Sequence, residues 1–442
     1  MLNYLINKFT NKRLYKNISY QGLQIFVVSL IQFLFPILII QIYNINILGI
    51  FFFFITTISL LDLFKLNITS YGTQKIWTYY NNNKKTQLEK ILNNSYTLSI
   101  INTVVILITI IFAFNILDLN FKIFDNLNPT TINIIFNLIL LNFIINSIIQ
   151  ILTIGISFKG ELYINYNLTT LFNLISRIFI ILVGIFINNM LAVLVTYSIA
   201  NFINLLIYIF YYNKNFSLFK LKFNKKIYSF FKKNNQKILS FSTSSSSTNI
   251  KNNLQIFIIS IIYGAEITAM ISTAKIIFYH LPLRIMGILI YNFSYEYLIL
   301  FTKKNFINIK KNYINHLHLI TILTVIIVIV GSIFGKGFYE FWLKESIQIP
   351  NIIIILILFD ASLTIIYQTS MIYLQAINNF FYIGLKRLLL EFLIVILFIL
   401  GFKYFGFSYE VFFLLNIFLM LGMIIYSIKI TFKNITKLNY VI

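Results

Sequence analysis

Long apolar stretches separated by short connections constrain this 442-residue chain more than any other feature. Hydrophobic residues make up 59% of the chain and charged residues only 11%. A bilayer core about 30 Å thick needs roughly 20 apolar residues per helix, so this length supplies about a dozen spans. The sequence therefore predicts an all-α polytopic membrane protein. The expected spans are 18–42, 45–66, 95–115, 131–156, 163–187, 190–211, 241–263, 266–300, 316–335, 350–376, 383–401 and 408–431.

The distribution of Lys and Arg predicts how these spans are oriented. Four basic residues precede the first apolar run, and no small-residue cleavage site follows it, which indicates an uncleaved first span. With the N-terminus inside, 27 basic residues fall on the cytoplasmic side and 4 on the outer side. Since cytoplasmic loops carry the excess of Lys and Arg, we expect both termini to be cytoplasmic and the number of spans to be even.

The seventh expected span is the most polar of the twelve. From Ser240 to Gln255 only three residues are apolar, yet the basic runs at 214–237 and 303–311 can both be cytoplasmic only if the chain crosses twice between them. A helix this polar cannot face lipid, so we expect its first half to face protein or a water-filled cavity. The alternative is that residues 242–249 form a cytoplasmic loop.

The longest basic connection divides the spans into two groups of six. We therefore expect an N-terminal lobe at 1–212, a basic cytoplasmic linker at 213–240 and a C-terminal lobe at 241–442. The outer turn at 46–51 after the first span corresponds in position to residues 265–270 after the seventh, which suggests an internal repeat. Repeats of this kind place a transport site between the lobes, around a central cavity near the bilayer midplane.

Composition narrows the classes of function. The chain has no cysteine and only three histidines, so it offers no disulfide, thiolate metal site or cysteine nucleophile, and little material for a zinc enzyme. The net charge of +23 is explained by cytoplasmic loops and does not point to nucleic acid. A membrane glycosyltransferase, polymerase or ligase would need a sizeable outer loop, and the longest outer segments are about fifteen residues. Asn is abundant, but Ile, Lys and Phe are abundant as well, which indicates a coding bias, so the number of Asn residues is not evidence for a function.

Short motifs give the chain a family resemblance. They are Pro36 followed by the turn at 48–52, the segment 71–76 at the inner end of the second span, and residues 263–267 and 272–275 in the second lobe. In these positions the chain resembles the polysaccharide (O-antigen or capsule) flippases, Wzx-type, of the multidrug/oligosaccharidyl-lipid/polysaccharide (MOP) exporter superfamily. Thr268 stands where that pattern leads us to expect glycine.

The resemblance implies a function that composition alone does not. It implies a non-enzymatic exporter in the bacterial cytoplasmic (inner) membrane that moves a polyprenyl-diphosphate-linked oligosaccharide outward by alternating access. The implied partners are this carrier, membrane lipids and other polysaccharide assembly proteins, with no cofactor except a coupling H⁺ or Na⁺. A multidrug (MATE-like) exporter and a lipid II flippase of the same superfamily remain alternatives.

Four cations at membrane depth are the candidate ligands for a diphosphate. A cation in the middle of a span costs about 2.5 to 3.5 kcal/mol on insertion scales, so each needs an acidic partner, a cavity or a function. Arg284 can instead extend toward the interface or pair with Glu296, and Arg177 can instead be a hydrogen-bond donor between the lobes. Pro282 should break or kink the helix beside Arg284. The candidate binding residues are Lys251, Arg284, Arg177 and Lys275, and the candidate cavity-lining residues are Ser244, Ser247, Gln255 and His280.

Two of the acidic residues in the spans have a basic residue nearby in the sequence, and a third, Asp360, does not. Asp62 has Lys65 three residues on, and Glu391 has Arg387 four residues before it, so each is expected to form a pair on one helix face. Asp360 has no basic neighbour, so we expect an unpaired carboxylate and a candidate for proton or sodium coupling, with a neutral buried acid as the alternative. Glu391 is a second candidate for ion coupling.

Overall fold

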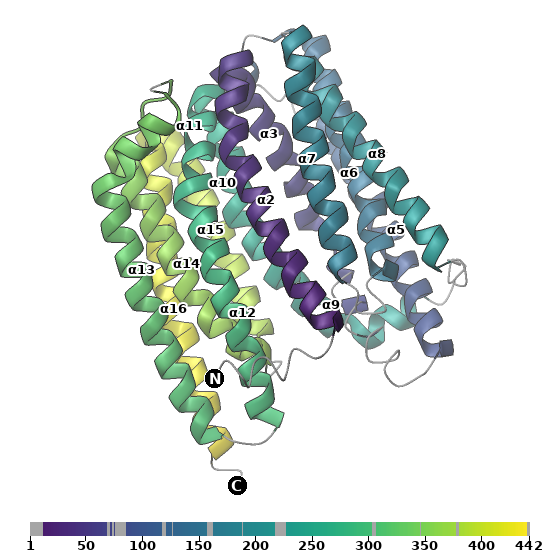
Figure 1. The fold of residues 1–442 in the computed structure, drawn as a ribbon, viewed down its shortest axis with the longest axis vertical. Helices are drawn as coiled ribbons and strands as arrows, with labels where there is room; N and C mark the ends of the chain where they lie inside the picture. The colour runs from purple at the N-terminus through teal and green to yellow at the C-terminus, as the bar shows by residue number, and fades with distance from the viewer. Residues whose placement is uncertain are drawn as a thin grey trace. The chain divides into compact units, whose positions relative to one another are not determined.

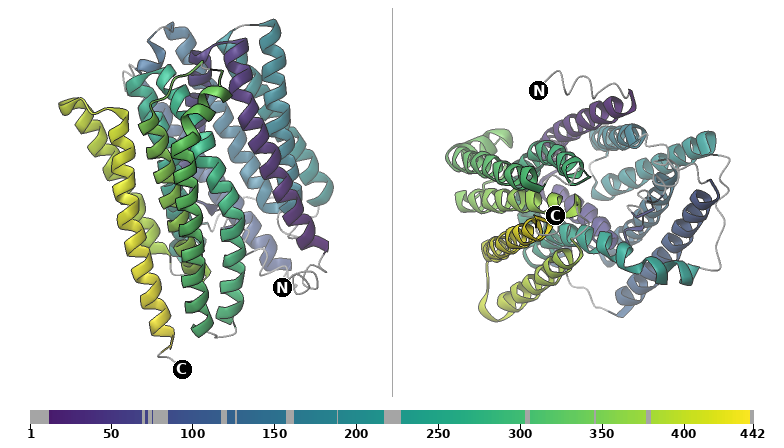
Figure 2. Two further views of the ribbon diagram at one scale, coloured as in Figure 1. Left: turned by 60° about the vertical axis from the view of Figure 1, so that its left-hand side comes forward. Right: turned by 90° about the horizontal axis from the view of Figure 1, so that it is seen from below.

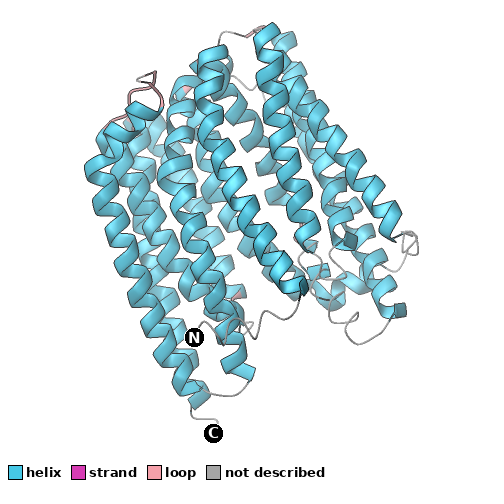
Figure 3. Ribbon diagram, in the orientation of Figure 1, coloured by secondary structure: helices cyan, strands magenta, loops and turns pink. Residues whose placement is uncertain are grey.

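The regular structure is entirely helical in the part of the chain that the computed structural model describes (Figures 1 and 3). The expected all-α fold is thereby confirmed. The described residues are 12–68, 71–72, 75, 85–116, 121–125, 127–156, 162–187, 189–216, 227–302, 306–344, 346–376 and 380–439.

The chain forms two compact units. The first comprises 1–249 with 260–265, and the second comprises 250–259 with 266–442. The division falls inside the seventh expected span, so the helix from 227 to 263 contributes to both units. The lobe limits expected from the sequence stay a prediction.

The first unit is built around α3 (Ile45–Leu61), which packs against α2, α6 and α8. This helix is strongly apolar, and 61% of its most apolar stretch is buried. Its start is capped by Asn44, whose side chain accepts a hydrogen bond of 2.8 Å from the backbone N–H of Ile47. The other elements of this unit are α2 (Lys12–Ile42), η1 (Asp62–Phe64), α5 (Lys85–Ile116), η2 (Lys122–Phe124), α6 (Pro129–Ile156), α7 (Leu162–Phe186), α8 (Met190–Phe216) and α9 (Ile227–Asn249).

The second unit is built around α14 (Asn351–Ala376), which packs against α12, α13 and α16 (Figure 2). In the most apolar stretch of α14, 67% of the residues are buried, the highest share of any described span. The other elements are η4 (Ile250–Leu254), α10 (Gln255–Tyr263), α11 (Ala265–Lys275), η5 (Ile276–His280), α12 (Leu281–Thr302), α13 (Phe306–Trp342), α15 (Phe381–Phe405) and α16 (Tyr409–Asn439).

Eleven described helices are long and apolar enough to cross a membrane, and they coincide with eleven of the twelve expected spans. The seventh expected span is absent from this set because its first half is too polar. It is nevertheless helical, since α9, η4 and α10 follow one another from 227 to 263 without interruption. The alternative of a loop at 242–249 is therefore wrong.

The polar half of this segment is satisfied by the first unit. Ser242 Oγ accepts a hydrogen bond of 2.8 Å from the backbone N–H of Asn67, and Ser246 Oγ donates to the carbonyl oxygen of Leu63 at 3.0 Å. Tyr71, from the motif at 71–76, donates to Asn234 Oδ1 at 2.6 Å. Of the two surroundings expected for this half, protein or a water-filled cavity, the bonds of Ser242 and Ser246 show protein. Part of that motif, residues 73–74 and 76, lies outside the described residues.

The expected linker at 213–240 overlaps two described helices and stays a prediction. Helix α8 continues to Phe216 and α9 begins at Ile227, so much of the basic stretch is helical and only 217–226 lies outside the described residues. Hydrogen bonds to Leu63 and Asn67 stabilise α9, a polar helix that hydropathy alone would not predict.

The two outer turns that correspond in sequence come into direct contact within the first unit. A Cβ atom added to Gly49 would overlap the backbone carbonyl of Ala265, so the two chain segments approach more closely than any residue with a side chain would permit. Glycine at position 49 is therefore required by backbone proximity rather than by its conformation.

Candidate functional site

A buried ion pair joins η4 to α14 in the second unit. Lys251 Nζ lies 2.6 Å from Asp360 Oδ1, and both side chains are only 1% exposed. The same ammonium donates to Thr364 Oγ1 at 2.5 Å. Thr364 lies one turn after Asp360 on α14, so both ligands of the ammonium come from one helix face. The expectation that Asp360 is an unpaired carboxylate is wrong, because its partner comes from a different helix.

Lys275 lies in the same unit at the end of α11. Its Nζ donates to Gln255 Oε1 at 3.0 Å and is 3.4 Å from the carbonyl oxygen of Asn252. Lys275 is only 1% exposed, yet among the described residues no carboxylate forms an ion pair with its ammonium group. Lys275 is therefore a buried cation whose described hydrogen-bond partners are neutral oxygens.

Tyr279 connects the two lysines. The Nζ atoms of Lys251 and Lys275 lie 5.6 Å and 5.2 Å from the centre of its ring, which is within the range of a cation–π interaction. Nothing in the sequence singled out this tyrosine, because its role depends on two lysines brought together from separate helices.

A second pair lies on α15, which packs against η4. Arg387 Nε is 3.4 Å from Glu391 Oε1, both residues are buried, and the guanidinium lies 4.9 Å from the centre of the Tyr367 ring. This pair confirms the same-face pairing expected from the sequence. Lys251, Lys275 and Arg387 together outnumber Asp360 and Glu391, so this cluster carries one more positive than negative group.

Both irregular turns of the second unit carry residues of this cluster. The π-helical turn η4 contains Lys251, and the π-helical turn η5 follows Lys275 and contains Tyr279. Pro282 is the second residue of α12 and has no N–H to bond the carbonyl four residues earlier. The helix carries a π-turn before the proline, but α11, η5 and α12 follow one another without a break, so the expected break beside Arg284 does not occur. Such π-turns often occur at functional sites.

The sequence places Ser244, Ser247, Lys251 and Gln255 at i, i+3, i+7 and i+11, which predicts one polar stripe along the seventh span, and η4 interrupts this stripe. The stripe assumed regular α-helical spacing, and the π-turn widens that spacing. Ser247 is buried in the first unit, whereas Gln255 binds Lys275 in the second. Ser244 lies on α9, but its side chain is outside the described residues.

Arg284 and His280 are half-buried and lie one turn apart at the start of α12 and the end of η5. The ring of His280 packs edge-on against Tyr279, with centroids 5.2 Å apart. The side chain of Glu296, the suggested partner of Arg284, is outside the described residues.

Arg177 of α7 occupies an aromatic surround in the first unit. Its guanidinium carbon lies 4.3 Å from the centre of the Phe35 ring, 4.7 Å from Phe51 and 6.0 Å from Tyr197. Its Nη1 is buried and has no hydrogen-bond partner among the described residues. Arg177 forms none of the described ion pairs, so it is the second buried cation held without a carboxylate.

Two further polar groups in the first unit are structural. Lys65 pairs with Asp62 at 2.5 Å, as expected, and Gln150 donates to the same carboxylate at 3.3 Å. Asn201 donates to the side-chain oxygens of Asn142 and Asn146 at 2.9 Å and 3.0 Å, which links α8 to α6. The asparagine bonds were missed because Asn is so common in this chain that its presence carried no signal.

Comparison with known proteins identifies the fold. No protein-family model and no curated sequence matches the chain. Among solved structures, it is similar to an inward-facing multidrug resistance MATE family transporter of the MOP superfamily, with a TM-score of 0.58, 13% identity and coverage of 97% of this chain and 98% of that one. It is also similar to an outward-facing MATE family transporter of the MOP superfamily, with a TM-score of 0.59, 14% identity and 96% coverage of both chains.

A third similar structure is a MOP superfamily transporter from Pyrococcus furiosus, whose binding pocket is described as having reverse polarity and suggesting a different function. Its TM-score is 0.59, with 14% identity and 96% coverage of both chains. At these identities the likeness shows a shared fold. The chain therefore has the all-helical fold of the MATE transporters of the MOP superfamily.

Proposed function

We propose that this chain is a membrane exporter that moves a polyprenyl-diphosphate-linked oligosaccharide from the cytoplasmic to the outer leaflet by alternating access. The fold supports a transporter, and the embedded cations favour an anionic cargo. The observation that carries the proposal is that Arg177 and Lys275 are both enclosed without a carboxylate partner among the described residues. A buried charge without a counterion is costly, so a chain that retains two of them gains when an anion binds.

The chemistry of the two cations suits phosphate oxygens. The planar guanidinium of Arg177 stacks on aromatic rings while its Nη1 remains available as a donor. Lys275 is a compact ammonium that exchanges neutral oxygen partners easily. Lys251 already has a carboxylate partner in Asp360. Its part in binding the diphosphate is to add positive potential near Lys275, since both ammonium groups lie close to the ring of Tyr279. Half-buried Arg284 at the start of α12 and His280 at the end of η5 belong to the same proposal, as a cation and a donor group.

The test of this proposal is transport by variants that remove one charge and keep a polar side chain. Arg177→Gln and Lys275→Gln are each expected to lower the export of a lipid-linked oligosaccharide about tenfold or more at normal protein abundance, because each forfeits a charge-assisted contact worth roughly 1.5 to 3 kcal/mol. The matched control is Lys336→Gln, which removes an exposed cation from α13. Wild-type export by the two buried variants would contradict the proposal.

A multidrug (MATE-like) exporter is the second candidate, and a lipid II flippase is a third. The MATE likeness of the fold and the buried carboxylates Asp360 and Glu391 favour the former, because carboxylates attract cationic drugs. Export of ethidium that is lost in Asp360→Asn but not in Arg177→Gln would favour the drug exporter. Export of lipid II but not of other lipid-linked glycans would favour the third candidate.

Ion coupling is the remaining part of the proposal. Asp360 Oδ2 is buried and has no hydrogen-bond partner among the described residues, which leaves one oxygen available to a proton or Na⁺. Glu391 is the second carboxylate of the cluster. We expect Asp360→Asn, reconstituted at equal protein amount, to make transport insensitive to the proton or sodium gradient. Unchanged dependence on both gradients would remove Asp360 from coupling.

A further inference from the structure

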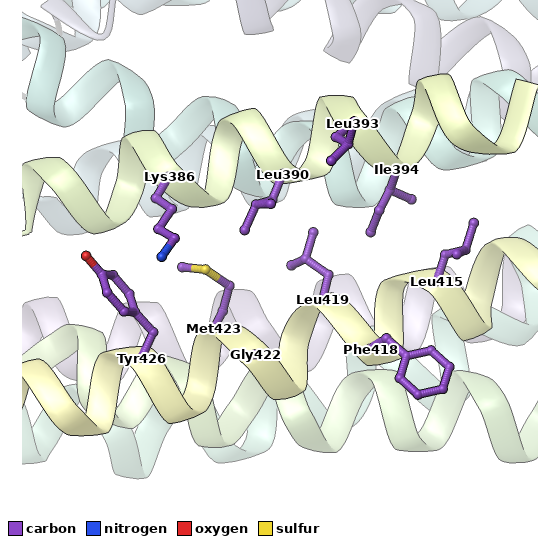
Figure 4. Close-up of a pocket in the computed structure, with 10 residues that line it drawn as sticks. All are labelled: Lys386, Leu390, Leu393, Ile394, Leu415, Phe418, Leu419, Gly422, Met423 and Tyr426. Carbon is purple, nitrogen blue, oxygen red and sulfur yellow. The ribbon is translucent and has the colours of Figure 1, made fainter. Parts of the chain in front are cut away.

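A groove runs along the outside of the second unit between α15 and α16 (Figure 4). It encloses about 320 Å³, and most of its lining is aliphatic, with Leu390 and Leu393 from α15 facing Leu419 and Met423 from α16. These helices belong to the part of the unit that carries the Arg387–Glu391 pair, but that pair lies on the buried face of α15. The groove is thus separate from the buried cluster.

The groove is open to the surroundings, and among the described residues no side chain covers Gly422 on its α16 side. Leu393 is 48% exposed and Phe418 is 69% exposed, so apolar side chains line an accessible channel. Gly422 lies in the middle of the α16 side, and a Cβ atom added there would meet no atom within 4 Å. In a membrane span such a channel must be filled by apolar matter, since water in contact with this lining is unfavourable.

One end of the groove is cationic. Lys386 lines it from α15, with its Nζ 3.8 Å from the centre of the Tyr426 ring on α16. Lys429 and Lys433 continue the same end of α16 and are exposed. Among the described residues, no carboxylate forms an ion pair with these three lysines. The charge distribution along the sequence predicts that this end is cytoplasmic.

The length of the groove matches one leaflet of a bilayer. From Lys386 to Ile394 along α15 the helix rises about 12 Å, and from Leu415 to Tyr426 along α16 it rises about 16 Å, at 1.5 Å per residue. Half of a hydrocarbon core of about 30 Å is about 15 Å. The groove is therefore about as long as one leaflet is thick, which is the extent of an acyl chain and shorter than a chain that crosses both leaflets.

We propose that this groove binds an anionic glycerophospholipid of the cytoplasmic leaflet. One acyl chain lies over Gly422 between the leucines, and the phosphate of the headgroup accepts hydrogen bonds from Lys386 while Tyr426 orients the ammonium. Lys429 and Lys433 add attraction for a negative headgroup. A resident lipid fills the space between the two helices and does not depend on which cargo the chain transports.

Native mass spectrometry of the purified full chain tests this assignment. The probes are phosphatidylglycerol and phosphatidylcholine with the same acyl chains. Wild type is expected to bind one phosphatidylglycerol about fivefold more tightly than phosphatidylcholine, which corresponds to about 1 kcal/mol for one lysine near an anionic headgroup. Lys386→Ala should remove this preference and leave phosphatidylcholine binding unchanged. The matched control is Lys403→Ala, which removes a cation from the other end of α15.

The apolar part of the site is tested by filling the groove. Gly422→Leu should abolish the saturable site for both lipids, whereas Gly337→Leu, at another glycine whose added Cβ meets no atom within 4 Å, should leave it intact. The proposal is overturned if Lys386→Ala retains the preference or if Gly422→Leu retains binding. It is also overturned if a polyprenyl phosphate displaces phosphatidylglycerol at lower concentration, or if wild type forms a dimer that Gly422→Leu abolishes.

Discussion

Breaking the Lys251–Asp360 ion pair should destabilise the protein more than breaking any exposed pair. The variant Asp360→Asn keeps the shape of the side chain and removes its charge, so Lys251 keeps only Thr364 and the ring of Tyr279 as close partners among the described residues. Both ionic side chains are 1% exposed, and water cannot replace the lost carboxylate. Leaving one member of a buried pair uncompensated costs about 3 to 5 kcal/mol.

The experiment is an unfolding titration of the purified chain in mixed micelles, with Glu340→Gln as the matched control. That variant also removes one carboxylate, but from the pair of Lys336 and Glu340, which lie 3.8 Å apart with side chains 52% and 32% exposed. An exposed pair of this kind contributes about 1 kcal/mol or less. Asp360→Asn should therefore lower the free energy of unfolding by several times as much as Glu340→Gln.

A third variant separates the ion pair from the packing around it. Lys251→Met with Asp360→Asn removes both charges, and because a buried pair costs desolvation energy, the double variant should recover most of the stability lost in the single one. The reasoning would be refuted if Asp360→Asn unfolded no more easily than Glu340→Gln, or if the losses measured for Asp360→Asn and for Lys251→Met alone simply added in the double variant.

Three other perturbations test separate parts of the structure. Gly49→Ala should lower stability by about 1 to 3 kcal/mol because its methyl group overlaps the carbonyl of Ala265, while Gly422→Ala, in open space, should not; thermal unfolding of both variants measures the difference. Arg177→Lys keeps the charge but not the planar stacking on aromatic rings, so we expect intermediate transport between wild type and Arg177→Gln in the oligosaccharide export assay. Reporter fusions after residue 224 and at the C-terminus should both report the cytoplasm, and an outside signal from either would contradict the orientation.

Residue patterns along the chain were sufficient to predict the spans. Eleven apolar stretches are helices near the expected limits. Hydropathy over about 20 residues is a local property of the sequence, and an apolar segment in a bilayer must satisfy its backbone hydrogen bonds within itself, as a helix does. The pairs Asp62–Lys65 and Arg387–Glu391 were equally predictable, since three or four residues on one helix bring side chains to the same face.

Contacts between helices were not predictable in the same way. Asp360 looked unpaired because the sequence shows only the neighbours on its own helix, and Lys251 reaches it from η4. The aromatic rings around Arg177 come from α2, α3 and α8, and no spacing in the sequence connects them. The irregular turn at η4 also changed which residues share a face.

The sequence by itself determined where the helices lie and that charge must be buried among them, because hydropathy and insertion cost depend on residue type alone. Only the tertiary structure decided which of those charges are compensated. A salt bridge or a cation–π contact depends on separations of a few ångström between helices far apart in the chain, and helix packing sets these separations. For this reason Lys251 is held by a carboxylate, while Lys275 and Arg177 are held by neutral groups alone among the described residues.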